Sequence, residues 1–107
     1  MSYYLFQGSY TSEAWSALVR KPRNRLQAIK ASVEKLGGRV EGGWLSFGDH
    51  DVVVVVRMPN NVSAAAFSLA VAAGGALKSG RTTPLLTFEE GAKAMRQAGK
   101  TGYRPPK

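Results

Sequence analysis

Apolar residues recur along this chain in two periods, and these periods predict which segments are strands and which are helices. Strands are expected where aromatic and β-branched residues gather in short runs bounded by glycine, proline or polar turn residues. These runs are residues 3–10, 39–47, 51–58 and 77–86. Helices are expected where apolar residues return every three or four positions. These segments are a short one after Thr11, followed by residues 26–36, 62–73 and 88–95.

Proline and glycine mark the ends of the predicted helices. Pro22 lacks a backbone N–H and disfavours helix at the residue before it, so the first helical region should break near Lys21. Gly37-Gly38 and Gly74-Gly75 follow the next two helical segments, as helix-ending glycines do. The helices are therefore expected as separate elements with defined ends.

The predicted elements follow the order β-α-β-β-α-β, with one more helix after them. This order is typical of the ferredoxin-like α+β fold, a four-stranded antiparallel sheet with helices on one face and the first and third strands at its centre. Pro84 cannot donate a ladder hydrogen bond, and Gly42-Gly43 weakens strand pairing, so their strands are expected at the edges, the second with a bulge. Gly48-Asp49 is expected at the centre of a two-residue hairpin turn.

The run Val52–Val56 lacks the alternation that a half-exposed strand shows. Consecutive valines present side chains to both faces of the sheet, so both faces should be buried. The helices can cover only one face, and an apolar face left open would be an interaction surface. We therefore expect a homodimer in which two sheets pack face to face as a dimeric α+β barrel, with stacking of dimers into larger assemblies left open.

Three short motifs resemble the GYD domain family, and the likeness covers about residues 3–90. The motifs are Gln7-Gly8-Ser9-Tyr10-Thr11, Gly48-Asp49-His50-Asp51 before the valine run, and Arg81-Thr82-Thr83-Pro84-Leu85 after an alanine-rich segment. Gly48 and Asp51 match the glycine and aspartate of the family's naming motif, and His50 stands where the tyrosine usually does. The family is similar to dimeric α+β-barrel proteins, so the resemblance implies that fold and that assembly.

The chain length of 107 residues corresponds to one small domain. We expect this domain to span residues 1–98 and to be followed by a flexible basic tail over residues 99–107. The absence of cysteine excludes disulfides and thiolate chemistry and agrees with a cytoplasmic location. No signal peptide is recognisable, and no apolar run approaches the ~20 residues of a membrane span, so no membrane partner is expected.

Positive charge is concentrated in two parts of a chain whose net charge is +8. Residues 20–39 contain seven basic side chains and one acid, and residues 91–107 contain five basic side chains and no acid. Such clusters form solvated surfaces or attract polyanions. The third predicted strand lacks the stacking aromatics of an RNA-recognition sheet. Nucleic acid is therefore not the expected partner, apart from weak, salt-sensitive association through the basic helix and tail.

The segment Asp49-His50-Asp51 supplies the candidate catalytic residues, His50 and Asp51. A carboxylate beside an imidazole stabilises its charged form, which suits a general acid or base. The alternative is structural, with Asp49 in the turn and Asp51 accepting from backbone N–H groups. One histidine without cysteine leaves too few ligands for a metal site, so neither a metal nor a cofactor is expected, although axial haem ligation by His50 stays open.

Five strand residues are candidates for binding a small molecule: Gln7, Ser9, Trp44, Arg81 and Thr83. They are polar or amphipathic side chains on strands that we expect to neighbour one another beneath the helices. A mostly apolar pocket with a few convergent polar groups is the usual form of a ligand site. The alternative is ordinary strand alternation, with Arg81 solvated at an edge.

The sequence thus predicts a small dimeric α+β-barrel protein that binds an unidentified small molecule in a pocket between the sheet and the helices. The alternative is a small cofactor-independent enzyme, oxygenase-like or isomerase-like, that uses His50 as an acid or base.

Overall fold

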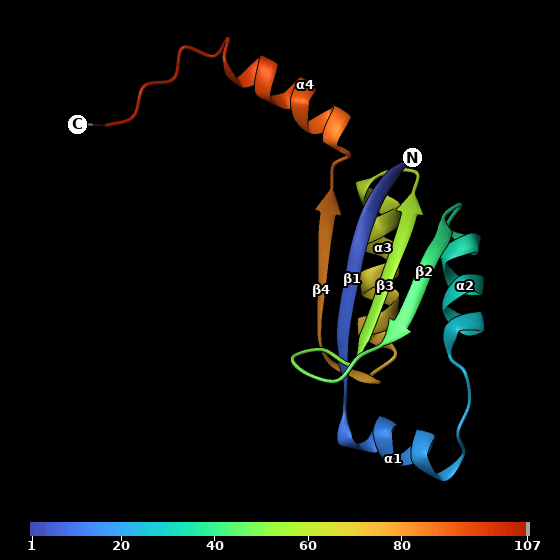
Figure 1. Ribbon diagram of the computed structural model, residues 1–107. Coiled ribbons are helices and arrows are strands. Elements are labelled where there is room, and N and C mark those ends of the chain that lie inside the picture. The colour runs from blue at the N-terminus through green and yellow to red at the C-terminus, as the bar shows by residue number, and fades with distance from the viewer. Residues whose placement is uncertain (107) are drawn as a thin grey trace.

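The computed structural model describes residues 1–106, and Lys107, the last residue of the predicted basic tail, lies outside the described residues. The elements follow the predicted order, and the α+β, ferredoxin-like arrangement is confirmed (Figure 1). Their bounds are β1 Ser2–Tyr10, α1 Ser12–Arg20, α2 Leu26–Lys35, β2 Arg39–Leu45, β3 Val52–Met58, α3 Asn61–Ala73, β4 Leu77–Leu85 and α4 Phe88–Ala98.

The four strands form one antiparallel sheet in the order β2-β3-β1-β4. The first and third strands of the chain are therefore the central ones, as predicted. Pro84 lies on the edge strand β4, and the register of the other edge strand, β2, shifts between Val40 and Gly42. Both edge predictions are confirmed, because a missing donor and an unpaired residue are tolerated best where one side of the strand is free.

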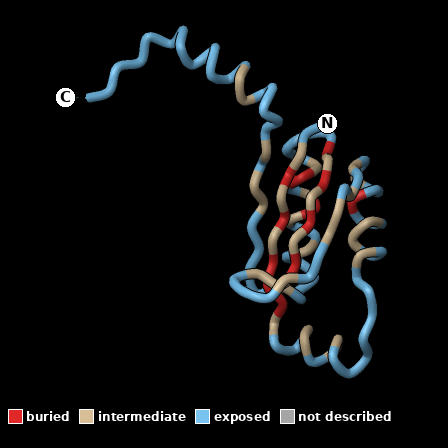
Figure 2. The backbone as a smooth tube through the Cα atoms, viewed as in Figure 1, coloured by how far each residue is buried: buried red, intermediate tan, exposed pale blue. Residues whose placement is uncertain are grey.

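The core lies between the sheet and the helices α2 and α3. Figure 2 shows the buried positions following β1 and β3. The buried apolar residues are Tyr4, Phe6 and Tyr10 of β1, Val52, Val54, Val56 and Met58 of β3, Val33 of α2, and Ala64 and Phe67 of α3. The rings of Phe6 and Phe67 meet edge to face, with centroids 5.2 Å apart. Each buried valine, phenylalanine or methionine side chain contributes about 1.5–3 kcal/mol, so this layer holds the fold together.

The opposite face of the sheet carries no helix, and we call it the open face. Figure 1 is viewed onto this face, with α3 behind the sheet. Val53 and Val55 point to it and are half-buried, whereas Val52, Val54 and Val56 on the helix face are buried. Within one chain the valine run is thus fully buried on one face only.

The connection between β2 and β3 is a loop over residues 46–51 rather than the predicted two-residue turn. The Ser46 backbone N–H donates to the Asp51 carbonyl oxygen at 2.8 Å and closes the loop. Three bonds then tie it to β1: the Asp51 N–H donates to Gly8 O at 2.8 Å, Ser9 Oγ donates to Asp49 O at 3.2 Å, and the Tyr10 N–H donates to Asp51 Oδ2 at 2.9 Å. The prediction was wrong because it weighed the local preference of Gly48-Asp49 without these contacts to β1.

Helix α4 projects from the body of the molecule (Figure 1). It begins with the predicted capping box, in which Thr87 Oγ1 accepts from Glu90 N at 3.0 Å and Thr87 N donates to Glu90 Oε1 at 2.8 Å. None of its residues is buried. The Cα radius of gyration, 17.2 Å, exceeds the ~13 Å of a compact domain of this length because of this projection. No helix within residues 1–106 combines the length and apolar character needed to cross a membrane.

Candidate functional site

A cavity of about 670 Å³ lies on the helix side of the sheet, between α1, α2 and the β2–β3 half of the sheet. Its walls are mainly apolar and aromatic, formed by Tyr10, Trp15, Leu18, Leu26, Ile29 and Val54. A cavity of this size and lining is typical of small-molecule sites. It exists because α1 and α2 are separate helices with a linker between them, which leaves part of the sheet uncovered.

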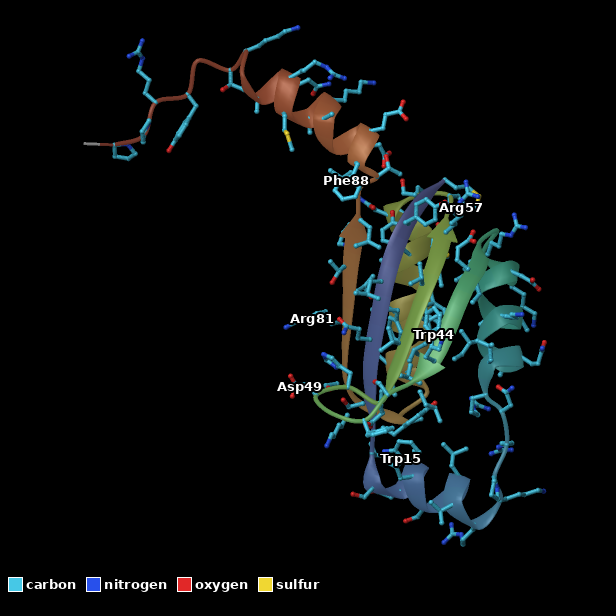
Figure 3. The ribbon with its side chains drawn as sticks, in the orientation of Figure 1. Trp15, Trp44, Asp49, Arg57, Arg81 and Phe88 are labelled. Atoms are coloured by element: carbon cyan, nitrogen blue, oxygen red, sulfur yellow. The ribbon has the colours of Figure 1, made fainter. Side chains whose placement is uncertain are left out.

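The wall formed by α1 is fixed to the sheet by several contacts. Thr11 caps the helix, since its Oγ1 accepts from Ala14 N at 3.1 Å, while the Thr11 N–H donates to Ala76 O at 2.9 Å. The Trp15 ring packs edge to face on the Tyr10 ring, with centroids 5.1 Å apart. Figure 3 shows Trp15 on the side of α1 that faces the end of the sheet. The two aromatic rings thereby form one end of the cavity.

Asp51 locks this end of the cavity in place. Its Oδ2 accepts from the Tyr10 backbone N–H at 2.9 Å and from the indole Nε1–H of Trp15 at 3.1 Å. The carboxylate therefore joins the β2–β3 loop, β1 and α1. An aspartate bound to two donors from other elements holds a structure together, and this is the structural alternative that the sequence left open for Asp51.

His50 lies beside Asp51 in the chain, but no hydrogen bond among residues 1–106 joins the two side chains. The Nδ1 atom of His50 is buried without a hydrogen-bond partner in the described residues. His50 is not one of the residues that line the 670 Å³ cavity. A catalytic role for His50 and Asp51 stays a prediction, and any such chemistry would take place outside this cavity.

The charged part of the cavity lining is supplied by the linker between α1 and α2. Arg23, Asn24 and Arg25 line it there. Asn24 Oδ1 accepts from the Leu26 N–H at 2.9 Å, which shapes the start of α2. Both arginines are exposed at the cavity mouth, and no aspartate or glutamate lines the cavity within the described residues. The electrostatic character of the mouth is therefore positive.

The five predicted binding residues lie on the open face rather than beneath the helices. The strand register places Trp44, Gln7 and Arg81 in one row across the sheet, with Val53 between Trp44 and Gln7. Thr83 and Ser9 lie in the rows on either side. The structure thus brings these residues to one face, but their expected location was wrong, because alternate residues of a strand point to opposite faces and Phe6 and Val54 face the helices.

Two of these residues have surroundings that bear on a binding role. Trp44 is 62% exposed on the edge strand, its ring lies over Gly42, and it also borders the helix-side cavity. Ser9 is buried, because the loop over residues 46–51 covers it and its hydroxyl is bonded to Asp49 O. Arg81 extends past the β4 edge, toward the side where Asp49 lies (Figure 3). Of the five, only Trp44 contacts the cavity.

Sequence reasoning did not assign Arg23, Arg25, Tyr10, Trp15 or Leu26 to a binding site. Signals for them were present in the chain. The basic cluster between residues 20 and 39 marks the cavity mouth, and the apolar faces on either side of Pro22 mark its walls. What could not be read was the angle between the two helices, which determines whether their apolar faces close on the sheet or leave a space.

Within residues 1–106, histidine, aspartate and glutamate side chains form no group of three that could hold a metal ion. Comparison with known proteins gives one informative result. No curated protein matches the chain at a significant level. The family model of the GYD domain matches residues 4–95, which is most of the chain. This protein therefore belongs to the GYD domain family.

Proposed function

We propose that this protein binds a small, largely apolar molecule in the cavity between α1, α2 and the sheet. The observation that carries the proposal is the cavity itself: about 670 Å³, walled mainly by aromatic and aliphatic side chains, with its charged groups, Arg23 and Arg25, supplied by the linker between α1 and α2. Functional ligand cavities usually measure roughly 300–1,000 Å³ and have this distribution of apolar and polar groups. A binding role needs no catalytic group in the cavity, which agrees with the position of His50 outside it.

A neutral apolar probe tests this proposal. N-phenyl-1-naphthylamine, whose fluorescence rises in apolar surroundings, should bind the wild-type protein at one site. Val19 is 74% exposed on α1 and lines the cavity, so Val19→Trp should fill the mouth at little cost in stability and weaken the probe about tenfold or more.

The control is Val62→Trp. Val62 is 79% exposed on α3 and does not line the cavity, so this change adds the same indole elsewhere and should leave probe binding unchanged. Wild-type protein that does not bind the probe, or equal weakening in both variants, would contradict the proposal.

We also propose that the protein is a homodimer in which the open faces of two sheets pack together as an α+β barrel. The support is the composition of that face. Its centre is apolar, with Leu5, Val53 and Val55, and polar side chains such as Gln7 and Arg81 lie to one side. An apolar centre with polar surroundings is typical of protein interfaces, and a two-fold axis lets one patch pair with its own copy.

Light scattering after size-exclusion chromatography tests the dimer. The wild-type protein should elute with the mass of two chains, and Val55→Glu, which places a charge at the centre of the open face, should produce monomers. Val62→Glu introduces the same charge on an exposed position of α3 and should leave the dimer intact. A monomeric wild-type protein would refute the proposed assembly, and circular dichroism verifies that both variants fold.

A further inference from the structure

We infer that the ligand of the helix-side cavity is an anionic amphiphile, with an apolar body in the cavity and a single carboxylate or similar anionic group held at the mouth by Arg23 and Arg25. This inference rests on the proposed binding function. It adds the charge and the polarity of the ligand, neither of which follows from the presence of a cavity.

The mouth of the cavity is positively charged. Arg23 and Arg25 both line the cavity, and no acidic side chain among residues 1–106 lines it with them. Neither arginine forms a salt bridge within the described residues. Both side chains are exposed, so their guanidinium groups are solvated and accessible to a ligand. These two present guanidinium donors to the cavity mouth, which suits an oxyanion that arrives from outside.

The interior of the cavity offers few polar groups to a ligand. The indole N–H of Trp15 is already donated to Asp51, so its ring presents apolar surface to the cavity. Leu18, Leu26 and Ile29 add aliphatic walls. A buried polar group without a partner is costly, so the inner part of the ligand must be apolar. A ligand with an apolar body and one negatively charged group at one end therefore matches both the interior and the mouth of the cavity.

Other ligand charges fit poorly. A cation at the mouth would meet two unpaired arginines in a chain whose net charge is +8. A zwitterion would need an acid in the cavity lining, and none is present among the described residues. A neutral apolar molecule would occupy the walls but would gain nothing from the two positive charges that line the cavity. An anionic amphiphile alone uses both parts of the cavity.

Two dyes with the same apolar body provide the test. The neutral one is N-phenyl-1-naphthylamine, and the anionic one is 1-anilinonaphthalene-8-sulfonate, which adds a sulfonate to that body. Titrations are made with the wild-type protein and with the double variant Arg23→Gln/Arg25→Gln. Glutamine keeps a polar, though shorter, side chain and removes the charge, and the control variant uses the same replacement. The matched control is Lys93→Gln/Arg96→Gln, which removes the same charge from exposed positions of α4 outside the cavity.

The wild-type protein should bind the anionic dye at least about fivefold more tightly than the neutral one, since both guanidinium groups are solvent-exposed and screened. The arginine double variant should lose this preference and keep its affinity for the neutral dye. The α4 control should behave like the wild-type protein with both dyes. Added salt should weaken the anionic dye only, because screening acts on the charged contact.

The possible failures are distinguishable. If the neutral dye binds in the cavity and the arginine double variant retains wild-type affinity for the anionic dye, the inference is wrong and the proposed binding function stands. The inference is equally wrong if the α4 control weakens the anionic dye as much as the arginine variant does, because general attraction to a basic protein would explain the result. If neither dye binds the wild-type protein, the proposed function fails and the inference fails with it.

Discussion

Replacing Phe67 with alanine should lower the free energy of unfolding by about 3–5 kcal/mol. Phe67 is 4% exposed on α3, and its ring contacts Phe6 edge to face at a centroid distance of 5.2 Å. Truncation removes the apolar surface of the ring and leaves a cavity against the central strand β1. Small domains have total stabilities of only about 5–15 kcal/mol, so this one side chain accounts for a large share of the total.

Chemical denaturation monitored by circular dichroism measures this loss. The control is Leu69→Ala, two residues further along α3. Leu69 is 70% exposed, so its removal should change the unfolding free energy by no more than about 0.5 kcal/mol. Equal losses in the two variants would mean that α3 does not pack on the sheet through the Phe67 side. A loss below about 1 kcal/mol for Phe67→Ala would mean that the Phe6–Phe67 contact is not central to the core.

Asp51→Ala should cost about 2–4 kcal/mol of unfolding free energy and should also weaken binding of the N-phenyl-1-naphthylamine probe, if that probe binds as proposed above. The change leaves the backbone N–H of Tyr10 and the indole N–H of Trp15 without their acceptor. Each buried donor that loses its partner costs about 1–3 kcal/mol. Because Asp51 is the link between the β2–β3 loop and α1, its loss should also loosen the aromatic end of the cavity, where Tyr10 and Trp15 form the wall.

Two further variants separate the hydrogen bonds of Asp51 from its charge. Asp51→Asn retains an oxygen that can accept from both donors, so it should lose roughly half as much stability as the alanine variant or less. Asp49→Ala is the control, because Asp49 takes part through its backbone oxygen, which accepts from Ser9 Oγ, and the substitution keeps that oxygen. Its unfolding free energy should stay near the wild-type value.

Tryptophan fluorescence detects the predicted loosening of α1. In a Trp44→Phe background the remaining signal comes from Trp15, whose emission should shift to longer wavelength in Asp51→Ala as water reaches the indole. Unchanged emission together with unchanged stability would show that Asp51 does not anchor α1. If His50 and Asp51 instead formed a catalytic pair, Asp51→Ala would abolish an activity while leaving stability and Trp15 emission as they are.

The strand predictions succeeded where each depended on one local property. Pro84 placed β4 at an edge because a residue without an N–H cannot serve two neighbouring strands. The valine run placed β3 at the centre because only a central strand needs apolar residues at every position. The prediction for Gly48-Asp49 failed because hydrogen bonds between the loop and β1 outweighed the local preference for a tight turn. These bonds join the Asp51 N–H to Gly8 O and the Ser9 hydroxyl to Asp49 O.

The lining of the cavity was predicted less well than the strands, because it depends on which face of the sheet each strand residue points to and on how the helices pack. The sequence correctly placed Gln7, Arg81 and Thr83 on neighbouring strands. Because Phe6 points into the core beneath the helices, its neighbour Gln7 points to the open face, and Arg81 and Thr83 point there with it. The residues that line the cavity come from α1, the linker and α2, and their meeting point depends on how two helices pack on the sheet. Ridge and groove contacts set such angles, and a single sequence does not display them.

The sequence by itself determined the order of the elements, the central and edge strands, the apolar helix face of the sheet and the family to which the chain belongs. These features rest on the residue types and spacings of single segments. Only the tertiary structure decided that Asp51 binds α1 instead of pairing with His50, that α4 projects from the body, and that the basic linker at Arg23 and Arg25 forms the mouth of an apolar cavity. Each of these depends on the distance between segments far apart in the chain, which is set by packing and not by local preference.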